Sequence, residues 1–241
     1  MSNELKSYYN IYNDLYDNRG YNPGRGNVVS VKRMTEEVWY ESLPSKWKLL
    51  DIGCARGGFL TSVNNKVNKK NPVCELHGID IARKAIIDCN RNLGPVAKCK
   101  VGSVTDIEYK DSTFDVIHSS DVLEHLFPED RELALQEIYR ILKPGSIFFG
   151  EVCLTFESYH SPGTGALLKE YQLRDLHIDP IMDDDWIDLF EKTNFQVTYR
   201  YTFVRTGIGG DPNRGYCRNP KDGFTTGLGQ CHLKFTCQKN D

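Results

Sequence analysis

Apolar runs and amphipathic stretches alternate through the middle of the chain, and this alternation predicts strands and helices in turn. Short segments made almost entirely of apolar residues have the character of buried strands. This character predicts a buried strand at 47–52, and further strands are predicted at 74–80, 96–102, 113–120 and 146–152. Segments with apolar residues at helical spacing lie before and between them, and several close at glycine or proline. The predicted helices are 28–42, 57–69, 82–94 and 129–145.

The pattern loosens after residue 153 but still contains regular elements. An acid-capped amphipathic helix is predicted at 183–195 and a strand at 196–204. A last strand at 231–237 alternates as an edge strand does. Because short strands joined by helices must run parallel, the chain is predicted to have an α/β fold. A ligand is then expected beyond the carboxyl ends of the strands.

Length and composition narrow the class of protein. A chain of 241 residues can bury a core of its own, and we expect a single domain over 1–241. The formal net charge of -3 argues against a dedicated nucleic-acid binder. No apolar stretch approaches the roughly 18 residues of a membrane span, and the N-terminus lacks a signal-peptide pattern. Four of the 8 cysteines sit singly in or beside apolar runs, so we expect a reduced, cytoplasmic protein.

The stretch "KLLDIGCARGGFL", residues 48–60, ends the first predicted strand with an acid and three glycines. Its spacing Gly53-x-Ala55-x-x-Gly58 nearly matches the dinucleotide fingerprint, in which a bare backbone approaches a pyrophosphate at a helix start. Asp51 lies inside the motif, however, where a pyrophosphate would meet its charge. An NAD-dependent oxidoreductase is therefore kept as an alternative only.

Together with "RILKPGS" ahead of the fifth strand, the stretch resembles the class I S-adenosylmethionine-dependent methyltransferases, over about residues 30–204. The first motif of that family reads acid-x-Gly-x-Gly-x-Gly, and the matching residues are Asp51, Gly53, Ala55 and Gly57. Alanine replaces the middle glycine. The resemblance implies a Rossmann-like doubly wound sheet of about seven strands, mostly parallel with an antiparallel C-terminal strand, and helices on both faces. It also implies a cofactor-binding core over 28–152 and a substrate-side part over 153–241.

The resemblance assigns residues to the binding of S-adenosylmethionine. The cofactor of this family lies against the glycine-rich backbone, where side chains must be minimal. Asp80, at the end of the second strand, would accept hydrogen bonds from both ribose hydroxyls, with an ordinary helix N-cap as the alternative. The implied cofactor residues are Arg25, Asp51, Gly53, Cys54, Ala55, Gly57, Asp80, Ile81, Ser103, Val104, Asp106 and Ser119.

The segment "DVLEH", at the end of the fourth strand, carries the candidate catalytic residues. If it is helical, Asp121 shares a face with Glu124 and with His125. It resembles the cation-binding segment of ubiquinone O-methyltransferases and of small-RNA 3′-end 2′-O-methyltransferases, which is completed by a later histidine. That resemblance implies a candidate divalent-metal set of Asp121, Glu124, His125 and His177. We prefer His125 as a base without metal; a metal site and a packing role are the alternatives.

Tyrosines crowd the N-terminal segment at helical spacing. Residues 1–27 are therefore expected to form a lid or cap, because tyrosine presents an apolar ring and a polar tip to a ligand. Tyr8 and Tyr12 are the candidate substrate contacts in this segment, and His160 is a further one. An amphipathic helix packed on the domain is the alternative to the lid.

A group of thiols and one imidazole occurs near the C-terminus. Its members are Cys217, Cys231, His232 and Cys237. The spacing contains no C-x-x-C pair, so we do not expect a zinc site there.

These features favour an enzyme that transfers a methyl group from S-adenosylmethionine to a hydroxyl, with an amine as the second choice. The expected acceptor is a small polar metabolite or a sugar or glycan precursor. No membrane or nucleic-acid partner is expected, and the oligomeric state is left open. Two other functions stay as alternatives: an RNA 3′-end 2′-O-methyltransferase with a divalent metal, and the NAD-dependent oxidoreductase.

Overall fold

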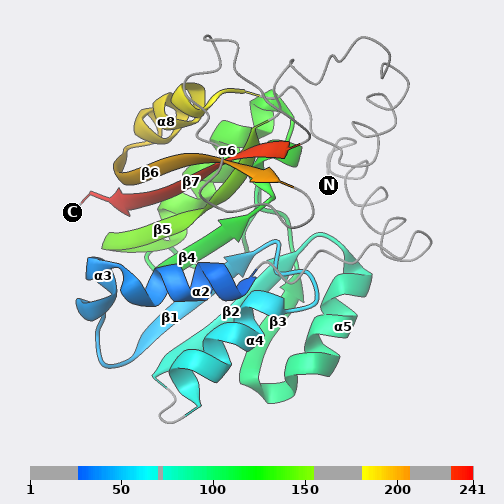
Figure 1. Cartoon of the computed structure of the whole chain (residues 1–241). Helices are drawn as coiled ribbons and strands as arrows, with labels where there is room; N and C mark the ends of the chain where they lie inside the picture. The colour runs from blue at the N-terminus through cyan, green and yellow to red at the C-terminus, as the bar shows by residue number, and fades with distance from the viewer. Residues whose placement is uncertain (1–26, 70–72, 155–180, 207–228, 241) are drawn as a thin grey trace.

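The computed structural model describes residues 27–69, 73–154, 181–206 and 229–240 (Figure 1). A seven-stranded sheet has the order β3-β2-β1-β4-β5-β7-β6. In chain order the strands are β1 (Trp47–Ile52), β2 (Cys74–Asp80), β3 (Ala97–Val101), β4 (Phe114–Ser120), β5 (Leu142–Leu154), β6 (Phe195–Thr206) and β7 (Gly229–Lys239). The described helices are α2 (Asn27–Glu36), α3 (Val38–Glu41), α4 (Gly58–Val63), α5 (Arg83–Leu93), α6 (Pro128–Ile141) and α8 (Asp183–Lys192). Three short helical turns are η1 (Asn64–Asn68), η2 (Gly94–Val96) and η3 (Leu123–His125).

The directions of the strands follow the prediction. β1 pairs in parallel with β2 and with β4, β2 pairs with β3, and β4 pairs with β5. β7 runs antiparallel to β5 on one side and to β6 on the other. The strand order reverses between β1 and β4, which is where doubly wound sheets bind their ligands. The fold is therefore the Rossmann-like α/β sheet, mostly parallel, with an antiparallel C-terminal strand.

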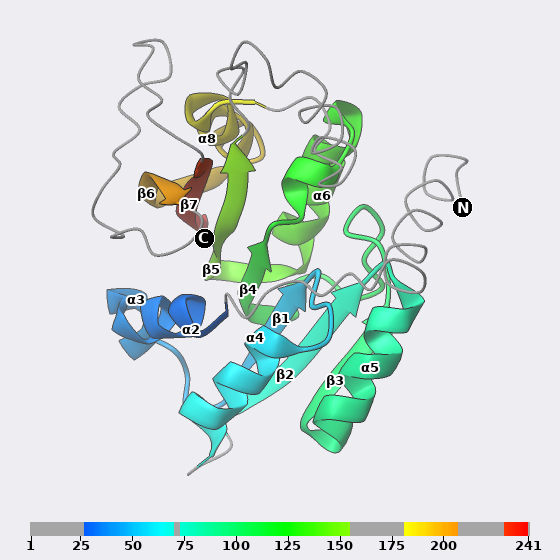
Figure 2. The same cartoon turned by 45° about the vertical axis from the view of Figure 1, so that its right-hand side comes forward.

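Alternating side chains of β1 enter two separate cores, one on each face of the sheet. Leu49 belongs to the core covered by α2, α4 and α5, whereas Leu50 and Ile52 belong to the core beneath α6 and α8. The two sets of helices lie on opposite sides of the strands in Figure 2. Because both faces of β1 are covered, the strand is apolar apart from Lys48 and Asp51.

The segment predicted as an edge strand lies inside the sheet instead. It forms most of β7, which pairs with a neighbour on each side, and β6 is the edge. The alternation suggested an edge strand because two of its three polar members are themselves buried: His232 and Thr236 are each 1% exposed, and the apolar Leu233 and Phe235 between them are 0% exposed. Buried polar side chains on a covered face produce the same pattern as solvent-facing ones on an open face.

Two predicted helices end elsewhere. The segment 28–42 is interrupted at Glu37, whose extended backbone (φ −78°, ψ 141°) separates α2 from α3. α6 ends before Leu142 rather than at 145, because the chain there is already extended and pairs Leu142 with Phe114 of β4. None of the helices among the described residues is both long and apolar enough to cross a bilayer.

Arg33 fastens α2 across two strands of the sheet. Its guanidinium donates to the carbonyl of Gly150 at 3.2 Å in β5, and to the carbonyl of Phe235 at 2.7 Å in β7. It also donates to Thr236 Oγ1 at 2.7 Å. Burial lowers the pKa of Arg33, and the nearby Glu37 carboxylate acts in the opposite direction. The helix that precedes β1 is thereby attached to the last strand of the chain.

Candidate functional site

The chain leaves β1 through a glycine turn formed by Gly53, Cys54, Ala55 and Gly57. Three of these residues have left-handed backbones, with φ of 71° at Gly53, 47° at Ala55 and 81° at Gly57. The amides of Gly53 and Cys54 both donate to the Ile79 carbonyl, at 2.8 and 3.0 Å. Ala55, which replaces the middle glycine of the motif, adopts the left-handed conformation despite its methyl group. The turn is thus fixed to the end of β2.

The glycine turn is closely packed on its protein side. A Cβ atom on Gly53 would collide with the side chain of Val122, which follows β4. A Cβ atom on Gly57 would lie 2.6 Å from Leu93 Cδ1 and 2.9 Å from Cys89 Sγ, both of α5. Side chains at these positions must therefore be absent. Val122 also brings the residues that follow β4 next to the turn.

Asp80 ends β2 and binds the glycine turn through its carboxylate. Oδ2 accepts the N–H of Ala55 at 2.9 Å, and Oδ1 accepts the N–H of Ala82 at 2.8 Å. Ala82 rather than Asp80 is the N-cap residue of α5, so the simple capping alternative is wrong. Burial raises the pKa of Asp80 to about 6, against the lowering effect of the two amide hydrogen bonds. Each carboxylate oxygen has a second acceptor position for a hydroxyl.

Asp51 lies within the sheet and is held by a histidine. It is 3% exposed, and its Oδ1 lies 2.7 Å from Nδ1 of His118 on the adjacent β4. Since a carboxylate only accepts, Nδ1 carries the proton. Burial raises the pKa of Asp51, while the hydrogen bond from His118 lowers it. Phe59 of α4 stacks on the imidazole at 3.8 Å, so His118 is the buried, hydrogen-bonded residue that its position in a strand predicts.

Other predicted cofactor residues lie at the same strand ends. Ser103 and Asp106 pair through an isolated bridge in the loop after β3, where Val104 is 7% exposed and joins the core beneath α6. Ile81 packs at the border of that core. Ser119, near the end of β4, is 1% exposed, and its hydroxyl has no hydrogen-bond partner in the part of the chain that the structure describes. A buried hydroxyl of this kind is suited to a ligand.

Two carboxylates and an imidazole meet where β4 ends. Asp121 follows β4 directly, and its N–H donates to the Glu151 carbonyl of β5 at 3.0 Å. His232 Nδ1, from β7, lies 3.0 Å from Glu151 Oε1 and 3.7 Å from Asp121 Oδ1. The side chain of His232 is 2% exposed and that of Glu151 8%, whereas that of Asp121 is 44% exposed. In this acid–histidine cluster of three residues, Asp121 is the member that a ligand can reach.

The "DVLEH" segment is not a continuous helix. Asp121 has a left-handed backbone with φ of 55°, and the helical turn η3 begins only at Leu123. Asp121 therefore does not share a helical face with Glu124 or with His125. The carboxylate of Asp121 instead points toward β5 and β7, because the N–H of Asp121 is hydrogen-bonded to β5.

Glu124 is buried and bonded to the main chain. It is 2% exposed, and Oε1 accepts the N–H of Cys153 at 2.9 Å. Burial raises the pKa of Glu124 well above its usual value, and the charge of Asp121 adds to the effect. His125 is half-buried in η3. Among the described residues, the possible metal-ligand atoms near that of Asp121 belong to Glu151 and His232, and not to Glu124 or His125.

Five predicted site residues lie outside the described residues: Tyr8, Tyr12, Arg25, His160 and His177. Their roles stay predictions. Two residues of the cluster were not predicted as site residues. Glu151 lies near the carboxyl end of the fifth strand, a position that the strand-end rule could have picked out. His232 gave no such signal, because only the insertion of β7 beside β5 brings it to this edge.

Comparisons with known proteins agree with this geometry. A family model described as a methyltransferase domain matches residues 50–150. The O-methyltransferase resE of Aspergillus sclerotiorum is 26% identical over 188 residues, which cover 75% of this chain and 66% of that protein. A carboxy-S-adenosyl-L-methionine synthase of Shewanella halifaxensis is 27% identical over 174 residues, which cover 70% of this chain and 65% of that protein.

The fold has counterparts among solved structures. A putative methyltransferase from Bacillus halodurans superposes with a TM-score of 0.65 at 12% identity, covering 89% of this chain and 99% of that one. The match to the two curated relatives spans just under two thirds of their length. Motif, sheet order, family model and relatives all agree. Residues 50–150 therefore match a methyltransferase domain, and the fold is that of solved S-adenosylmethionine-dependent methyltransferases.

Proposed function

We propose that this protein transfers a methyl group from S-adenosylmethionine to a hydroxyl oxygen of a small polar molecule, such as a sugar or glycan precursor. The observation that carries the proposal is the acid–histidine cluster beside the glycine turn. The side chain of Val122 fills the space that a Cβ atom on Gly53 would occupy, and Asp121 directly precedes Val122 in the chain. A group able to take up a proton thus lies next to the place where a methyl donor is expected.

The cofactor end of the site fits S-adenosylmethionine. The glycine turn presents a backbone without large side chains, and Asp80 offers two carboxylate oxygens that each retain an acceptor position. A ribose supplies two adjacent hydroxyls, which is the donor pattern that such a carboxylate binds. The buried hydroxyl of Ser119 adds a further polar contact at the end of β4.

The acid–histidine cluster explains the choice of oxygen. S-adenosylmethionine, when bound, supplies an electrophilic methyl group, so the protein has mainly to align an acceptor and remove its proton. The exposed Asp121 carboxylate accepts a hydrogen bond from the acceptor hydroxyl. The proton passes from the hydroxyl to this carboxylate as the oxygen attacks the methyl group. His232 lies behind Asp121 with its Nδ1 3.0 Å from Glu151 Oε1 and 3.7 Å from Asp121 Oδ1, so it positions the Asp121 carboxylate. A neutral amine needs less help of this kind, because it is nucleophilic before it loses a proton.

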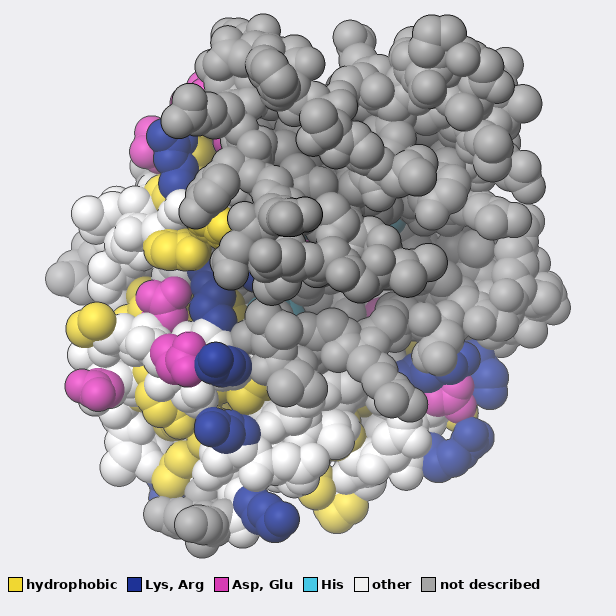
Figure 3. Space-filling model, in the orientation of Figure 1, with side chains coloured by type: hydrophobic (Ala, Val, Ile, Leu, Met, Phe, Trp, Pro, Cys, Tyr) yellow, Lys and Arg dark blue, Asp and Glu magenta, His cyan; other side chains and the backbone are white. Residues whose placement is uncertain are grey.

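Two features weigh against the alternatives. The order of a dinucleotide-binding sheet is 3-2-1-4-5-6 without an inserted strand, whereas here the antiparallel β7 separates β5 from β6. On the described part of the face in Figure 3, basic and acidic side chains are intermixed, which suits a small acceptor better than an RNA backbone.

The free thiols of Cys54, Cys74 and Cys153 support a reducing, cytoplasmic location as part of the proposal.

The test is binding followed by transfer with the full chain. Calorimetry should detect S-adenosylmethionine and S-adenosylhomocysteine but not NAD. Methyl-labelled S-adenosylmethionine is then offered with hexoses, nucleotide sugars and hydroxy acids, with the matching amino sugars, and with an RNA oligomer. Label is expected in the hydroxyl compounds. Binding of NAD alone would overturn the family function, and label only in the amino sugars or the RNA would overturn the acceptor class.

S-adenosylhomocysteine is expected to bind more weakly as the pH falls through about 6. The pKa of Asp80 is raised from 3.8 to about 6, so a carboxylate that is ionised at neutral pH becomes protonated there and accepts ribose hydroxyls poorly. The dissociation constant should rise by about tenfold per pH unit below this value. The raised pKa of Asp80 also affects the free energy of unfolding of the free protein. The stabilisation that the protonated carboxyl contributes is fully present below pH 3.8 and is lost as the pH rises through about 6.

Calorimetry between about pH 5 and 8 measures the effect, with Asp80→Asn as the comparison. Asparagine cannot ionise, so the variant should bind weakly at every pH and show no step. A step of the same size in the variant would mean that another group controls binding.

A further inference from the structure

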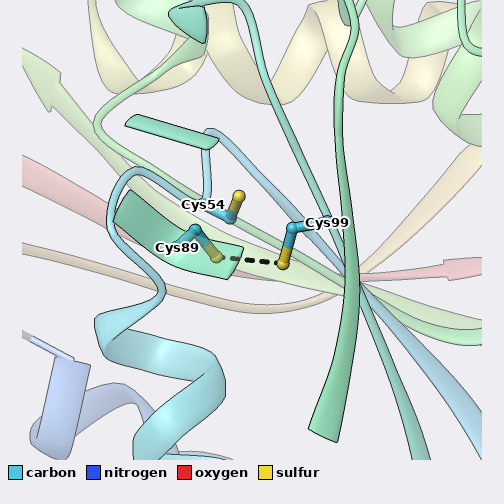
Figure 4. A group of neighbouring side chains, drawn as sticks. All are labelled: Cys54, Cys89 and Cys99. Carbon is cyan, nitrogen blue, oxygen red and sulfur yellow. Dashed lines mark hydrogen bonds between the residues drawn. The ribbon is translucent and has the colours of Figure 1, made fainter. Parts of the chain in front are cut away.

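Three cysteines converge beneath the glycine turn from three different elements. Cys54 belongs to the turn itself, Cys89 to α5 and Cys99 to β3 (Figure 4). Figure 4 shows the sulfur of Cys89 facing that of Cys99, with Cys54 beside them. Cys89 Sγ and Cys99 Sγ are 2.9 Å apart, and all three sulfur atoms lie within 4.8 Å of one another.

The thiol cluster of Cys54, Cys89 and Cys99 is shielded but can be reached. Cys89 is 0% exposed and Cys54 3%, whereas Cys99 is half-buried on β3, the strand at one edge of the sheet. The ligand-type atoms of the cluster are all sulfur, with no carboxylate or imidazole in the group. Three sulfur donors at one point select soft, thiophilic cations over Mg²⁺ or Ca²⁺.

We propose that Cys54, Cys89 and Cys99 form a binding site for one thiophilic metal ion, of which Zn²⁺ and Cu⁺ are the candidates. Each cysteine forms one metal–sulfur bond and gives up its thiol proton to solvent, so binding releases protons. Three protein ligands fill a trigonal site for Cu⁺, or leave one position of a tetrahedral Zn²⁺ site for water.

The site is mechanically connected to the glycine turn. Zn–S bonds of about 2.3 Å set the sulfur atoms about 3.8 Å apart, so Cys89 and Cys99 must separate by about 0.9 Å. Cys89 Sγ also lies 2.9 Å from where a Cβ atom on Gly57 would be. Metal binding therefore displaces a neighbour of Gly57 and weakens cofactor binding. That effect rests on the proposed function, whereas metal binding does not.

The experiment counts metal ions on the reduced, metal-free full chain. Zn²⁺ is titrated against a chelating dye, and Cd²⁺ is titrated while the ultraviolet charge-transfer band of cadmium–thiolate bonds is recorded. The wild type should bind one more ion per chain than Cys99→Ser or Cys89→Ser. Cys74→Ser is the matched control, since Cys74 is also buried but lies outside the cluster, and it should bind as the wild type does. Excess Mg²⁺ should not compete.

Several outcomes would overturn the proposal. Equal numbers of ions on the wild type and on both cluster variants would do so. A Cys89–Cys99 disulfide in the freshly purified chain, seen as a mass lower by two hydrogens, would show an oxidised pair in place of a metal site. If the variants do not fold, the wild type decides: Zn²⁺ must protect Cys99 from alkylation in peptide maps, and equal labelling with and without Zn²⁺ refutes the site. Calorimetry with S-adenosylhomocysteine is run separately, so failure of the proposed function is distinguishable.

Discussion

Replacing His232 with asparagine is expected to lower kcat by about 10²-fold, because the imidazole positions the Asp121 carboxylate, and a positioned proton acceptor contributes at least that much. The imidazole lies between Glu151 at 3.0 Å and Asp121 at 3.7 Å, and no other imidazole is found within this cluster of described residues. Asp121→Asn should have an effect of similar size and should also raise KM, since its carboxylate is the exposed member. Steady-state kinetics with the acceptor identified in the labelling experiment measures both.

His77→Asn is the matched control for His232→Asn. His77 is also buried in the sheet, where it contacts Tyr109 at 3.0 Å and Glu75 at 3.1 Å, but it lies within β2 and not at its carboxyl end. It should leave kcat within a factor of about 2, and all three variants should bind S-adenosylhomocysteine as the wild type does. A kcat for His232→Asn within tenfold of the wild type, in a variant that still binds the cofactor product, would contradict the assigned role.

Gly53→Ala is expected to destabilise the protein by about 2–5 kcal/mol, from about 1–2 for a left-handed non-glycine residue and about 1–3 for the forced contact. The backbone at Gly53 has φ of 71°, and the new methyl group would collide with the Val122 side chain. Displacement of Val122 also moves Asp121. Urea unfolding should give a lower midpoint, and calorimetry should show weaker binding of S-adenosylhomocysteine.

Gly94→Ala separates the two contributions. Gly94 also has a positive φ, of 52°, but a Cβ there meets nothing within 4 Å. Its substitution should cost only a backbone part, about 1–3 kcal/mol, because its backbone (φ 52°, ψ −127°) lies in a region that residues other than glycine rarely adopt. Combining Gly53→Ala with Val122→Ala should recover part of the contact cost. Equal losses for Gly53→Ala and Gly94→Ala would show that the contact with Val122 contributes nothing.

Local sequence pattern was sufficient for elements whose surroundings are uniform. β1 and β2 have the predicted bounds, because most of their residues are buried between the two layers of helices and each strand ends in a turn. The sequence pattern did not predict which strands lie on the two sides of β7 in the sheet. The sequence of β7 does not reveal that β6 pairs outside it, since pairing order is decided by packing between distant segments.

The candidate site divides in the same way. The glycine turn directly follows β1, and Asp80 is the last residue of β2. Their positions therefore follow from the strand assignment alone. The acid–histidine cluster could not be assembled from local pattern, because Asp121, Glu151 and His232 come from three separate segments. Asp121 shares a face with Glu124 or His125 only if the segment is helical, whereas its left-handed backbone directs it to β5 and β7. Left-handed conformations of aspartate depend on tertiary contacts that the sequence around it does not display.

The position of β7 between β5 and β6 has a consequence for biosynthesis. β6 leaves the ribosome before β7, yet its ladder is formed with β7, as is the ladder at the outer edge of β5. Until residues 229–239 have been synthesised, β5 has an open edge and β6 has no place in the sheet. The anchor of Arg33 on Phe235 is equally late. A nascent chain stalled before residue 229 should therefore be sensitive to proteases and to aggregation through its uncovered strands, and the domain should complete its folding only after residues 229–239 have emerged.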